Sequence, residues 1–410
     1  MSPAGSQPQS YHVACFCLGG TPHFDVTVQI EQGHVVDVVP GKSHSAVELG
    51  RVALVDGLVN AHTHLEFSLL SQPIPTNGRF TDWIRSVVKH RQAHPDSTAD
   101  AIRAGIRESL SAGTTLIGEI ATTGWSASDY AAAGCPTVVF QEVLGQSPVR
   151  VSQQVQLARS VVETAAGKLS PGISPHAPYS THLDLVRESV AIARMRGCPV
   201  AMHLAETSSE LELLTSQSGE FRELLSDFGI WNENLFPTPR RALDYLHVLA
   251  EAPRALIVHG NYLNDEELRF IAAQPQMTLV YCPRTHFAFG HDPHPWRRLL
   301  KMGGRVAIGT DSRASNPDLS LFAELQFLAR HHPEISPWEL LQAGSITGRT
   351  ALDPESNASP TAANLTSIAL GEIQDANFGQ TLFHLKSHVC GTMIQGKWVW
   401  RNTDGSSIAR

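Results

Sequence analysis

The stretch LVDGLVNAHTHL, residues 54–65, decides how the rest of the chain is interpreted. Its apolar residues predict a buried strand that continues to Asn60, and His62 and His64 follow at its far end. Side chains at positions i and i+2 of a strand point to the same face. The two imidazoles should therefore face one point, an arrangement that suits a metal ion. The rest of the chain is then expected to supply further ligands, a proton carrier and a scaffold.

Composition narrows the classes of protein that the chain can represent. Its 410 residues, 42% apolar and 17% charged, predict a globular protein with one large domain and a small one. The net charge of −8 and the scattered Lys and Arg argue against nucleic acid or a membrane surface as the main partner. A small-molecule substrate is the expected partner, and a homo-oligomer is possible. Twenty histidines are the unusual feature.

The N-terminal segment and the cysteines indicate the compartment. Residues 1–16 lack the charged region and the apolar run of a secretory signal, and no run of about 18 apolar residues follows. Six cysteines in so long a chain do not suggest a disulfide framework. Cys15 and Cys17 alternate in a predicted strand and should be reduced and buried. We therefore expect a cytoplasmic protein.

The chain divides into β-rich ends and an α/β middle. Short alternating segments in residues 11–50 and again near the C-terminus predict a composite β-sandwich domain built from residues 1–55 and 355–410. Between them, residues 56–354 alternate eight apolar strands with helices. Such strands indicate a parallel sheet covered on both faces, and eight of them close a (β/α)8, TIM-like barrel. A doubly wound open sheet is the alternative, but its Gly-rich fingerprint is absent.

Polar residues gather at the ends of five predicted barrel strands, where such barrels carry their active sites. They are His62 and His64 on the first strand, His176 on the fourth, His203 and Glu206 on the fifth, His259 on the sixth and Asp311 on the eighth. A single histidine at a strand end is usually a structural residue. Together, however, these strand ends predict one functional site.

The donor set predicts a hydrolytic metal centre. His62, His64, His203 and Asp311 offer three imidazole nitrogens and one carboxylate, which suit zinc and also fit iron or manganese. The apolar strand segments contain no lysine that could bridge two ions, so one ion is expected. Such an ion would bring the pKa of a bound water towards neutrality. Glu206 could then shuttle protons, His259 could hydrogen-bond the attacking oxygen, and Asp311 could accept a proton.

Six segments give the sequence a resemblance to a known family. They are GLVNAHTHLEFS (57–68), ISPHAPYS (173–180), HLAET (203–207), VHGNYL (258–263), CPRTHFAFG (282–290) and GTDSRASN (309–316). The chain resembles the amidohydrolase superfamily, in its metal-dependent deaminase branch with S-adenosylhomocysteine and aminodeoxyfutalosine deaminases and triazine chlorohydrolases. The resemblance implies the same metal ligands and the same roles for Glu206 and His259. It also implies that His176 contacts substrate, commonly a ribose hydroxyl.

Features around the predicted site bear on the substrate. The segment CPRTHFAFGH departs from the Asn- and Lys-containing pattern of many adenosine-type relatives, and HLAETSSELELL looks closer to aminodeoxyfutalosine deaminases. Glu66, Arg284, His286 and residues 218–221 are candidates for selectivity. If the strand continues that far, Glu66 shares the strand face of the ligands, and it should face the substrate pocket rather than the metal. Arg284 should either bind a substrate carboxylate or form an internal salt bridge.

The favoured hypothesis is a deaminase acting on an aminopurine-type nucleoside, with 6-amino-6-deoxyfutalosine as the leading candidate. Hydrolysis of another bond, such as a C–Cl or cyclic amide bond, would use the same centre. A non-catalytic barrel is the alternative from another class. Stoichiometric metal in the purified protein would favour an enzyme, and its absence would favour the non-catalytic barrel.

Overall fold

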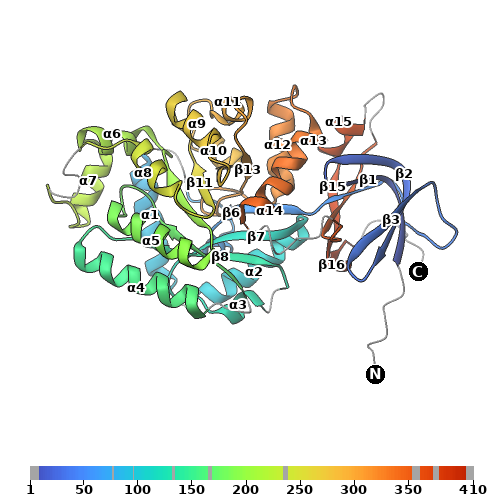
Figure 1. The fold of residues 1–410 in the computed structure, drawn as a ribbon, viewed down its shortest axis with the longest axis horizontal. Coiled ribbons are helices and arrows are strands. Elements are labelled where there is room, and N and C mark those ends of the chain that lie inside the picture. The colour runs from blue at the N-terminus through green and yellow to red at the C-terminus, as the bar shows by residue number, and fades with distance from the viewer. Residues whose placement is uncertain are drawn as a thin grey trace.

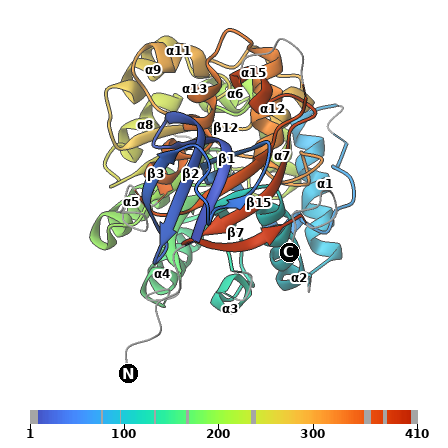
Figure 2. The same ribbon diagram turned by 90° about the vertical axis from the view of Figure 1, so that its right-hand side faces the viewer.

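The computed structural model describes residues 9–75, 78–95, 97–131, 134–164, 169–233, 239–352, 361–372 and 378–402. The chain forms a parallel β-barrel surrounded by helices and a second sheet at one end of the molecule (Figure 1). Both ends of the chain contribute to that second sheet, which Figure 2 shows in front of the barrel. The predicted fold class is confirmed.

Eight parallel strands make the barrel, and they lie side by side in the order of the sequence. They are β6 (Leu58–Thr63), β7 (Thr114–Ala121), β8 (Thr137–Val143), β9 (Ser170–Pro175), β10 (Val200–Leu204), β11 (Ala255–His259), β12 (Met277–Tyr281) and β13 (Val306–Ile308). The first and last strands meet where the backbone N–H groups of Thr310 and Asp311 both donate to the His62 carbonyl, each at 3.1 Å. A Cβ on Gly309 would lie 2.9 Å from the His62 carbonyl oxygen, so only glycine allows this approach. These contacts bring the two edge strands together, so the barrel is nearly closed.

The apolar run at residues 52–63 is divided between the two sheets. β5 (Val52–Asp56) joins the sheet of the chain ends, whereas β6 begins the barrel. Gly57 lies between them, where a Cβ would come within 2.3 Å of the Thr115 side chain. The prediction of one continuous strand from Leu54 to Asn60 is therefore wrong, because the chain changes sheets at this glycine.

The second sheet has the order β16-β15-β14-β5-β1-β2-β3, with β4 beside β1. Its strands are β1 (Gln9–Leu18), β2 (Thr21–Glu31), β3 (His34–Pro40), β4 (Val47–Glu48), β5, β14 (Leu365–Ala369), β15 (His388–Ile394) and β16 (Lys397–Arg401). It curls around its own apolar core, to which Val13, Leu54 and Leu365 belong. The boundary near residue 55 stays a prediction, and the one at 355 lies outside the described residues.

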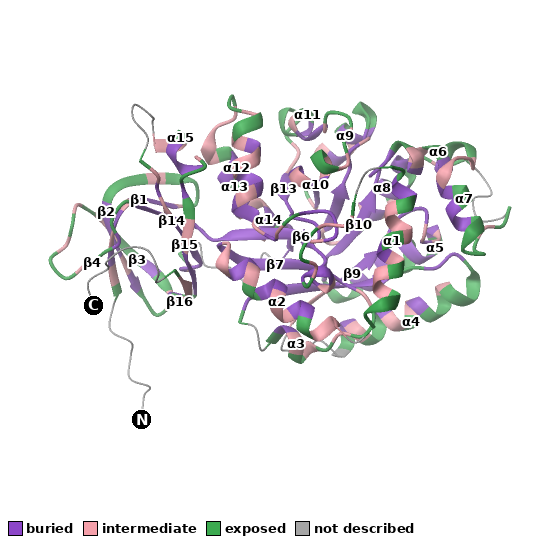
Figure 3. Ribbon diagram, turned by 180° about the vertical axis from the view of Figure 1, so that it is seen from behind, coloured by how far each residue is buried: buried purple, intermediate pink, exposed green. Residues whose placement is uncertain are grey.

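The helices are amphipathic and bury their apolar faces, while the barrel strands are almost wholly buried (Figure 3). They are α1 (Phe80–Ala93), α2 (Thr98–Ser111), α3 (Ala127–Ala131), α4 (Pro148–Thr164), α5 (Leu183–Arg196), α6 (Ser208–Ser216), α7 (Glu220–Asp227), α8 (Ala242–Leu249), α9 (Asp265–Ala272), α10 (Pro283–Ala288), α11 (Trp296–Lys301), α12 (Leu321–His331), α13 (Pro337–Ala343), α14 (Ile346–Leu352), α15 (Phe378–Leu382) and the 3-10 helix η1 (Leu65–Phe67). Within the described residues, none of these helices has the length and apolarity needed to cross a membrane.

Candidate metal centre and active site

The structure brings the four predicted metal ligands together at the carboxyl end of the barrel. His64 Nε2 lies 3.3 Å from His203 Nε2. The Nε2 atoms of His62 and His64 lie 3.6 and 3.8 Å from Asp311 Oδ1. These last separations are too long for hydrogen bonds and fit atoms that face a common ion. His259 joins His62 and Asp311 in a second group of closely spaced donor atoms.

The hydrogen bonds around the cluster fit a metal ion. Both ring nitrogens of His62 and Nδ1 of His64 are buried and have no hydrogen-bond partner within the described part of the chain. His203 Nδ1 lies 3.0 Å from the His176 carbonyl, which fixes its N–H there and leaves Nε2 as a free lone pair. Ser315 Oγ donates to Asp311 Oδ2 at 2.5 Å. A divalent ion at the cluster would supply the partner that His62 Nε2 lacks.

Three non-glycine residues at the rim have left-handed backbone conformations. The φ angles are 52° at Ala205, 66° at His259 and 56° at Asp311. Each costs about 1–3 kcal/mol and persists where surrounding contacts enforce it, most often at functional sites. His294 Nε2 donates to the His259 carbonyl at 2.8 Å, and the His62 carbonyl holds the Asp311 N–H. These backbone conformations therefore fix the directions of the His259 side chain at the end of β11 and of the Asp311 side chain after β13.

Glu206 lies beside the cluster in a buried position. Its Oε1 is 3.3 Å from His259 Nε2. Burial raises the pKa of Glu206 well above its usual range, and the charges of Asp311 and Glu210 add to this effect. Burial also lowers the pKa of His259, helped by His203, so that its ring stays neutral. A carboxyl group with a raised pKa can hold a proton and pass it to a neighbouring group.

Glu210 positions the loop that carries Glu206. Its carboxylate accepts the backbone N–H of Ala205 at 2.8 Å and that of Glu206 at 3.1 Å. A carboxylate on an amphipathic helix is usually solvated, but the Glu210 side chain is fully buried. The pattern Thr207-x-x-Glu210 could have revealed it, since a Glu at this spacing often returns to the N-terminus of its helix.

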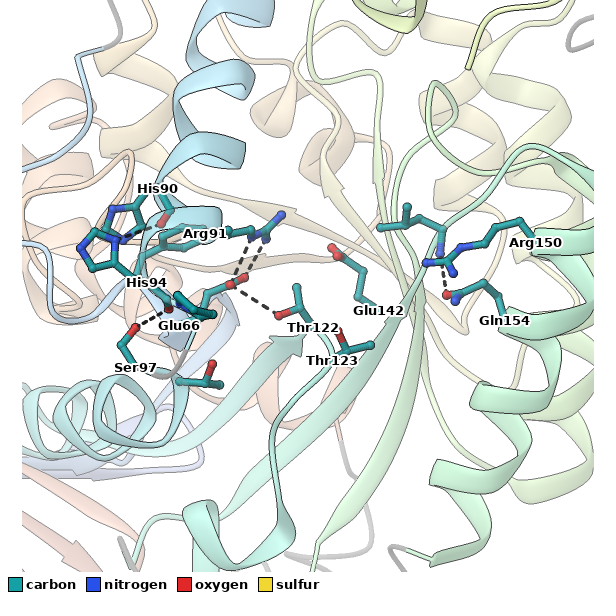
Figure 4. Close-up of a pocket in the computed structure, with 14 residues that line it drawn as sticks. Glu66, His90, Arg91, His94, Ser97, Thr122, Thr123, Glu142, Arg150 and Gln154 are labelled. Atoms are coloured by element: carbon teal, nitrogen blue, oxygen red, sulfur yellow. Dashed lines mark hydrogen bonds and ion pairs between the residues drawn. The ribbon is translucent and has the colours of Figure 1, made fainter. Parts of the chain in front are cut away.

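Beside the cluster lies a pocket that is lined by one of the predicted substrate contacts, Glu66 (Figure 4), whereas His176 is not among its lining residues. His176 Nδ1 lies 2.6 Å from Ser180 Oγ, and its ring centre is 5.1 Å from that of His203. Glu66 lines the pocket, but the strand does not continue far enough for it to share the strand face of the ligands, because β6 ends at Thr63 and Glu66 lies on η1. Arg91 donates to both Glu66 carboxylate oxygens, at 3.1 and 2.7 Å.

Arg284 forms an internal salt bridge, which is one of the two alternatives that the sequence allowed. Its guanidinium donates to Glu324 Oε1 at 2.7 Å and to both carboxylate oxygens of Asp318, at 3.1 and 2.7 Å. Glu324 is fully buried, and burial raises its pKa while the charge of Arg284 lowers it. The expected role in binding a substrate carboxylate is corrected: the guanidinium is already committed to two carboxylates of this chain.

Replacing Arg284 with methionine should reduce stability rather than change substrate affinity. Loss of the cation leaves Glu324 buried without its partner, which costs about 3–5 kcal/mol of the free energy of unfolding. Chemical denaturation measures this change. Arg297→Met is the matched control, because its ion pair with Glu334 is exposed and should matter little. A stable variant with a raised KM for an anionic substrate would contradict this assignment.

The other selectivity candidates have mainly structural contacts. His286 Nε2 lies 2.9 Å from the Asp292 carbonyl. Ser218 Oγ donates to Glu212, and Phe221 is buried with its ring stacked on Tyr179 at 4.3 Å. The sequence reasoning missed Arg91 and also Glu142, which lines the pocket from β8.

Comparison with known proteins assigns the chain to a family. A model described as "Amidohydrolase family" matches residues 54–399, and the chain belongs to this family of hydrolases. The superfamily resemblance found in the sequence is thereby confirmed.

Individual relatives are more distant. An aminodeoxyfutalosine deaminase of Nitratiruptor sp. is 26% identical over 285 residues, which are 68% of each chain. A 5-methylthioadenosine/S-adenosylhomocysteine deaminase of Pyrococcus furiosus is 25% identical over 350 residues, 79% of this chain and 77% of that one. The structure of Helicobacter pylori aminofutalosine deaminase with methylthio-coformycin superposes with a TM-score of 0.80 at 21% identity, covering 96% of this chain and 100% of that one. This last likeness shows the fold.

Proposed function

We propose that this protein is a metal-dependent deaminase that releases ammonia from a 6-aminopurine nucleoside. The observation that carries the proposal is the buried Glu206–His259 pair beside four convergent metal-type donors. Membership of the amidohydrolase family and the deaminase names of the relatives support it. The cysteines are free thiols in the described residues, which supports the expectation of a reducing cytoplasm.

His62, His64, His203 and Asp311 would hold one divalent ion, and three imidazoles with one carboxylate favour zinc. When bound, such an ion lowers the pKa of water and acts as a Lewis acid. The His203–His176 hydrogen bond fixes the tautomer in which Nε2 faces the cluster. The Ser315 hydroxyl similarly fixes one oxygen of Asp311. The protein thus orients its donor atoms before any ion arrives.

Proton transfer belongs to Glu206 and His259. Glu206 takes the proton from the attacking water and delivers it to the ring nitrogen beside the amino-bearing carbon. His259 is neutral and hydrogen-bonds the oxygen that adds to that carbon. Glu206 then moves the proton of the newly added hydroxyl to the amino group, and collapse of the tetrahedral carbon to the carbonyl breaks the C–N bond and releases ammonia. The 3.3 Å separation of Glu206 and His259 keeps both groups beside the reacting carbon.

Ammonia release from a substrate panel tests the proposal. The purified protein, supplemented with zinc, would be given adenosine, 5′-methylthioadenosine, S-adenosylhomocysteine, 6-amino-6-deoxyfutalosine, guanine and a chlorotriazine. Ammonia should appear in equal amounts with the 6-oxopurine product of at least one nucleoside. Chloride release from the triazine without ammonia from any nucleoside would favour the chlorohydrolase. A protein without stoichiometric metal or turnover would be a non-catalytic barrel.

A further inference from the structure

His294, in the loop between α10 and α11, has a hydrogen bond at each of its ring nitrogens. Its Nδ1 lies 3.0 Å from the backbone nitrogen of Trp296. A backbone N–H can only donate, so Nδ1 carries the lone pair and Nε2 carries the proton. Nε2 then donates to the carbonyl of His259 at 2.8 Å. Because the ring also stacks on Tyr281 at the end of β12, with 3.9 Å between the ring centres, both its tautomer and its orientation are fixed.

The carbonyl that His294 holds belongs to a residue in an unfavourable backbone conformation. His259 ends β11 with a φ angle of 66°, in the left-handed region that few non-glycine residues adopt. Such a conformation persists only where the surrounding structure enforces it. The direction of a carbonyl depends on the ψ angle of its own residue, so a fixed donor at the His259 oxygen restrains that angle. His294 therefore restrains the backbone from which the His259 side chain projects.

The loop that begins at His259 also holds the loop that carries Glu206. Asn261 Nδ2 donates to the Glu206 carbonyl at 2.9 Å, and the backbone N–H of Tyr262 donates to the Ala205 carbonyl at 3.0 Å. The Glu206 and His259 side chains are themselves 3.3 Å apart. A change in the backbone at His259 would therefore displace both side chains of the pair.

We infer that His294 is a positioning residue for the proton-transfer pair Glu206 and His259, and that it acts through its hydrogen bond to the His259 carbonyl. The inference rests on the proposed function and extends it to a side chain that orients the pair through the backbone. A displacement of about 1 Å among groups that act on the reacting carbon costs about a hundredfold in rate. Groups that act mainly in the transition state affect kcat rather than KM. Loss of this hydrogen bond should therefore lower kcat.

Two substitutions separate the two hydrogen bonds of His294. The side-chain nitrogen of glutamine can take the position of Nε2 and donate to the His259 carbonyl, whereas the side-chain oxygen of asparagine can take the position of Nδ1 and accept from Trp296. His294→Gln thus keeps the contact with His259, and His294→Asn keeps the contact at the start of α11. Both variants lose the ring that stacks on Tyr281, so this loss does not distinguish them.

The kcat for ammonia release should fall about a hundredfold in His294→Asn at an unchanged KM, and it should stay close to the parent value in His294→Gln. A purely structural role predicts the reverse order, because asparagine caps the start of a helix well. A parent-like kcat in His294→Asn, or an equal loss in both variants, would overturn the inference. His291→Asn is the control from the same loop: His291 Nδ1 lies 3.3 Å from the Tyr262 hydroxyl, and kcat should match that of the parent.

A measurement that needs no turnover separates this inference from the proposed function. If the parent protein deaminates no nucleoside, the proposed function fails. Heteronuclear NMR spectra of histidine-labelled protein still report the surroundings of the His259 ring, whose signals are identified by their loss in His259→Asn. These signals should shift in His294→Asn and keep their parent positions in His294→Gln. Parent positions in His294→Asn, or equal shifts in both variants, would overturn the positioning role.

Discussion

Replacing Glu206 with glutamine should lower kcat for ammonia release by about a thousandfold or more while metal content stays at the level of the parent protein. The amide has the same shape but cannot take a proton from water and pass it to the purine, and proton transfer of this kind contributes about 10²–10⁴ in rate. Because Glu206 contacts His259 rather than the four proposed ligands, metal binding should survive. Steady-state kinetics and elemental analysis of the same preparation measure both quantities.

Glu212→Gln is the control for this experiment. Glu212 is exposed on α6, six residues after Glu206. The Glu212→Gln substitution removes the same charge without altering the site. Its activity should match that of the parent protein. If Glu206→Gln retained activity, Glu206 would lose its role as proton carrier, whatever the metal content.

Replacing His203 with alanine should weaken metal affinity by more than about a hundredfold, since even partners behind a ligand contribute about 10–100-fold. The variant loses the Nε2 that lies 3.3 Å from His64 Nε2, and two imidazoles with one carboxylate remain. Competition with a chromophoric chelator measures the dissociation constant. Activity should fall in parallel with occupancy and recover in part at high metal concentration.

His247→Ala provides the comparison. His247 is exposed on α8 and contacts Phe270, so its loss should leave metal affinity unchanged. Full occupancy in His203→Ala, with a dissociation constant like that of His247→Ala, would mean that His203 is not a ligand.

Much of the site was accessible from the sequence because it depends on strand ends alone. His62, His203, His259 and Asp311 each follow an apolar run, and the carboxyl ends of all barrel strands meet at one rim. Their convergence therefore requires the order of the strands but no knowledge of the helices. The fold class was predictable for the same reason, from eight alternations in the middle and similar β segments at both ends.

The errors arise where a partner comes from a distant helix. Arg284 lies at a strand end, where a substrate contact is expected. Its guanidinium instead forms a salt bridge with Glu324, which lies forty residues later on α12. Glu66 pairs with Arg91 on α1, 25 residues further along the chain, and no local pattern shows this contact. Glu142 lies near the end of β8, and its Oε1 has no hydrogen-bond partner among the residues that the structure describes; a missing contact of this kind leaves no mark in the sequence.

Closure of the barrel has a consequence for biosynthesis. Because the His62 carbonyl receives the N–H groups of Thr310 and Asp311, the first barrel strand cannot complete its contacts until the last one has left the ribosome. The ligand set is divided in the same way, so a nascent chain should bind the ion weakly until Asp311 emerges. β5 likewise waits for β14, with one edge exposed meanwhile to pairing with other chains. Translation speed and chaperone supply should therefore govern the yield of active protein.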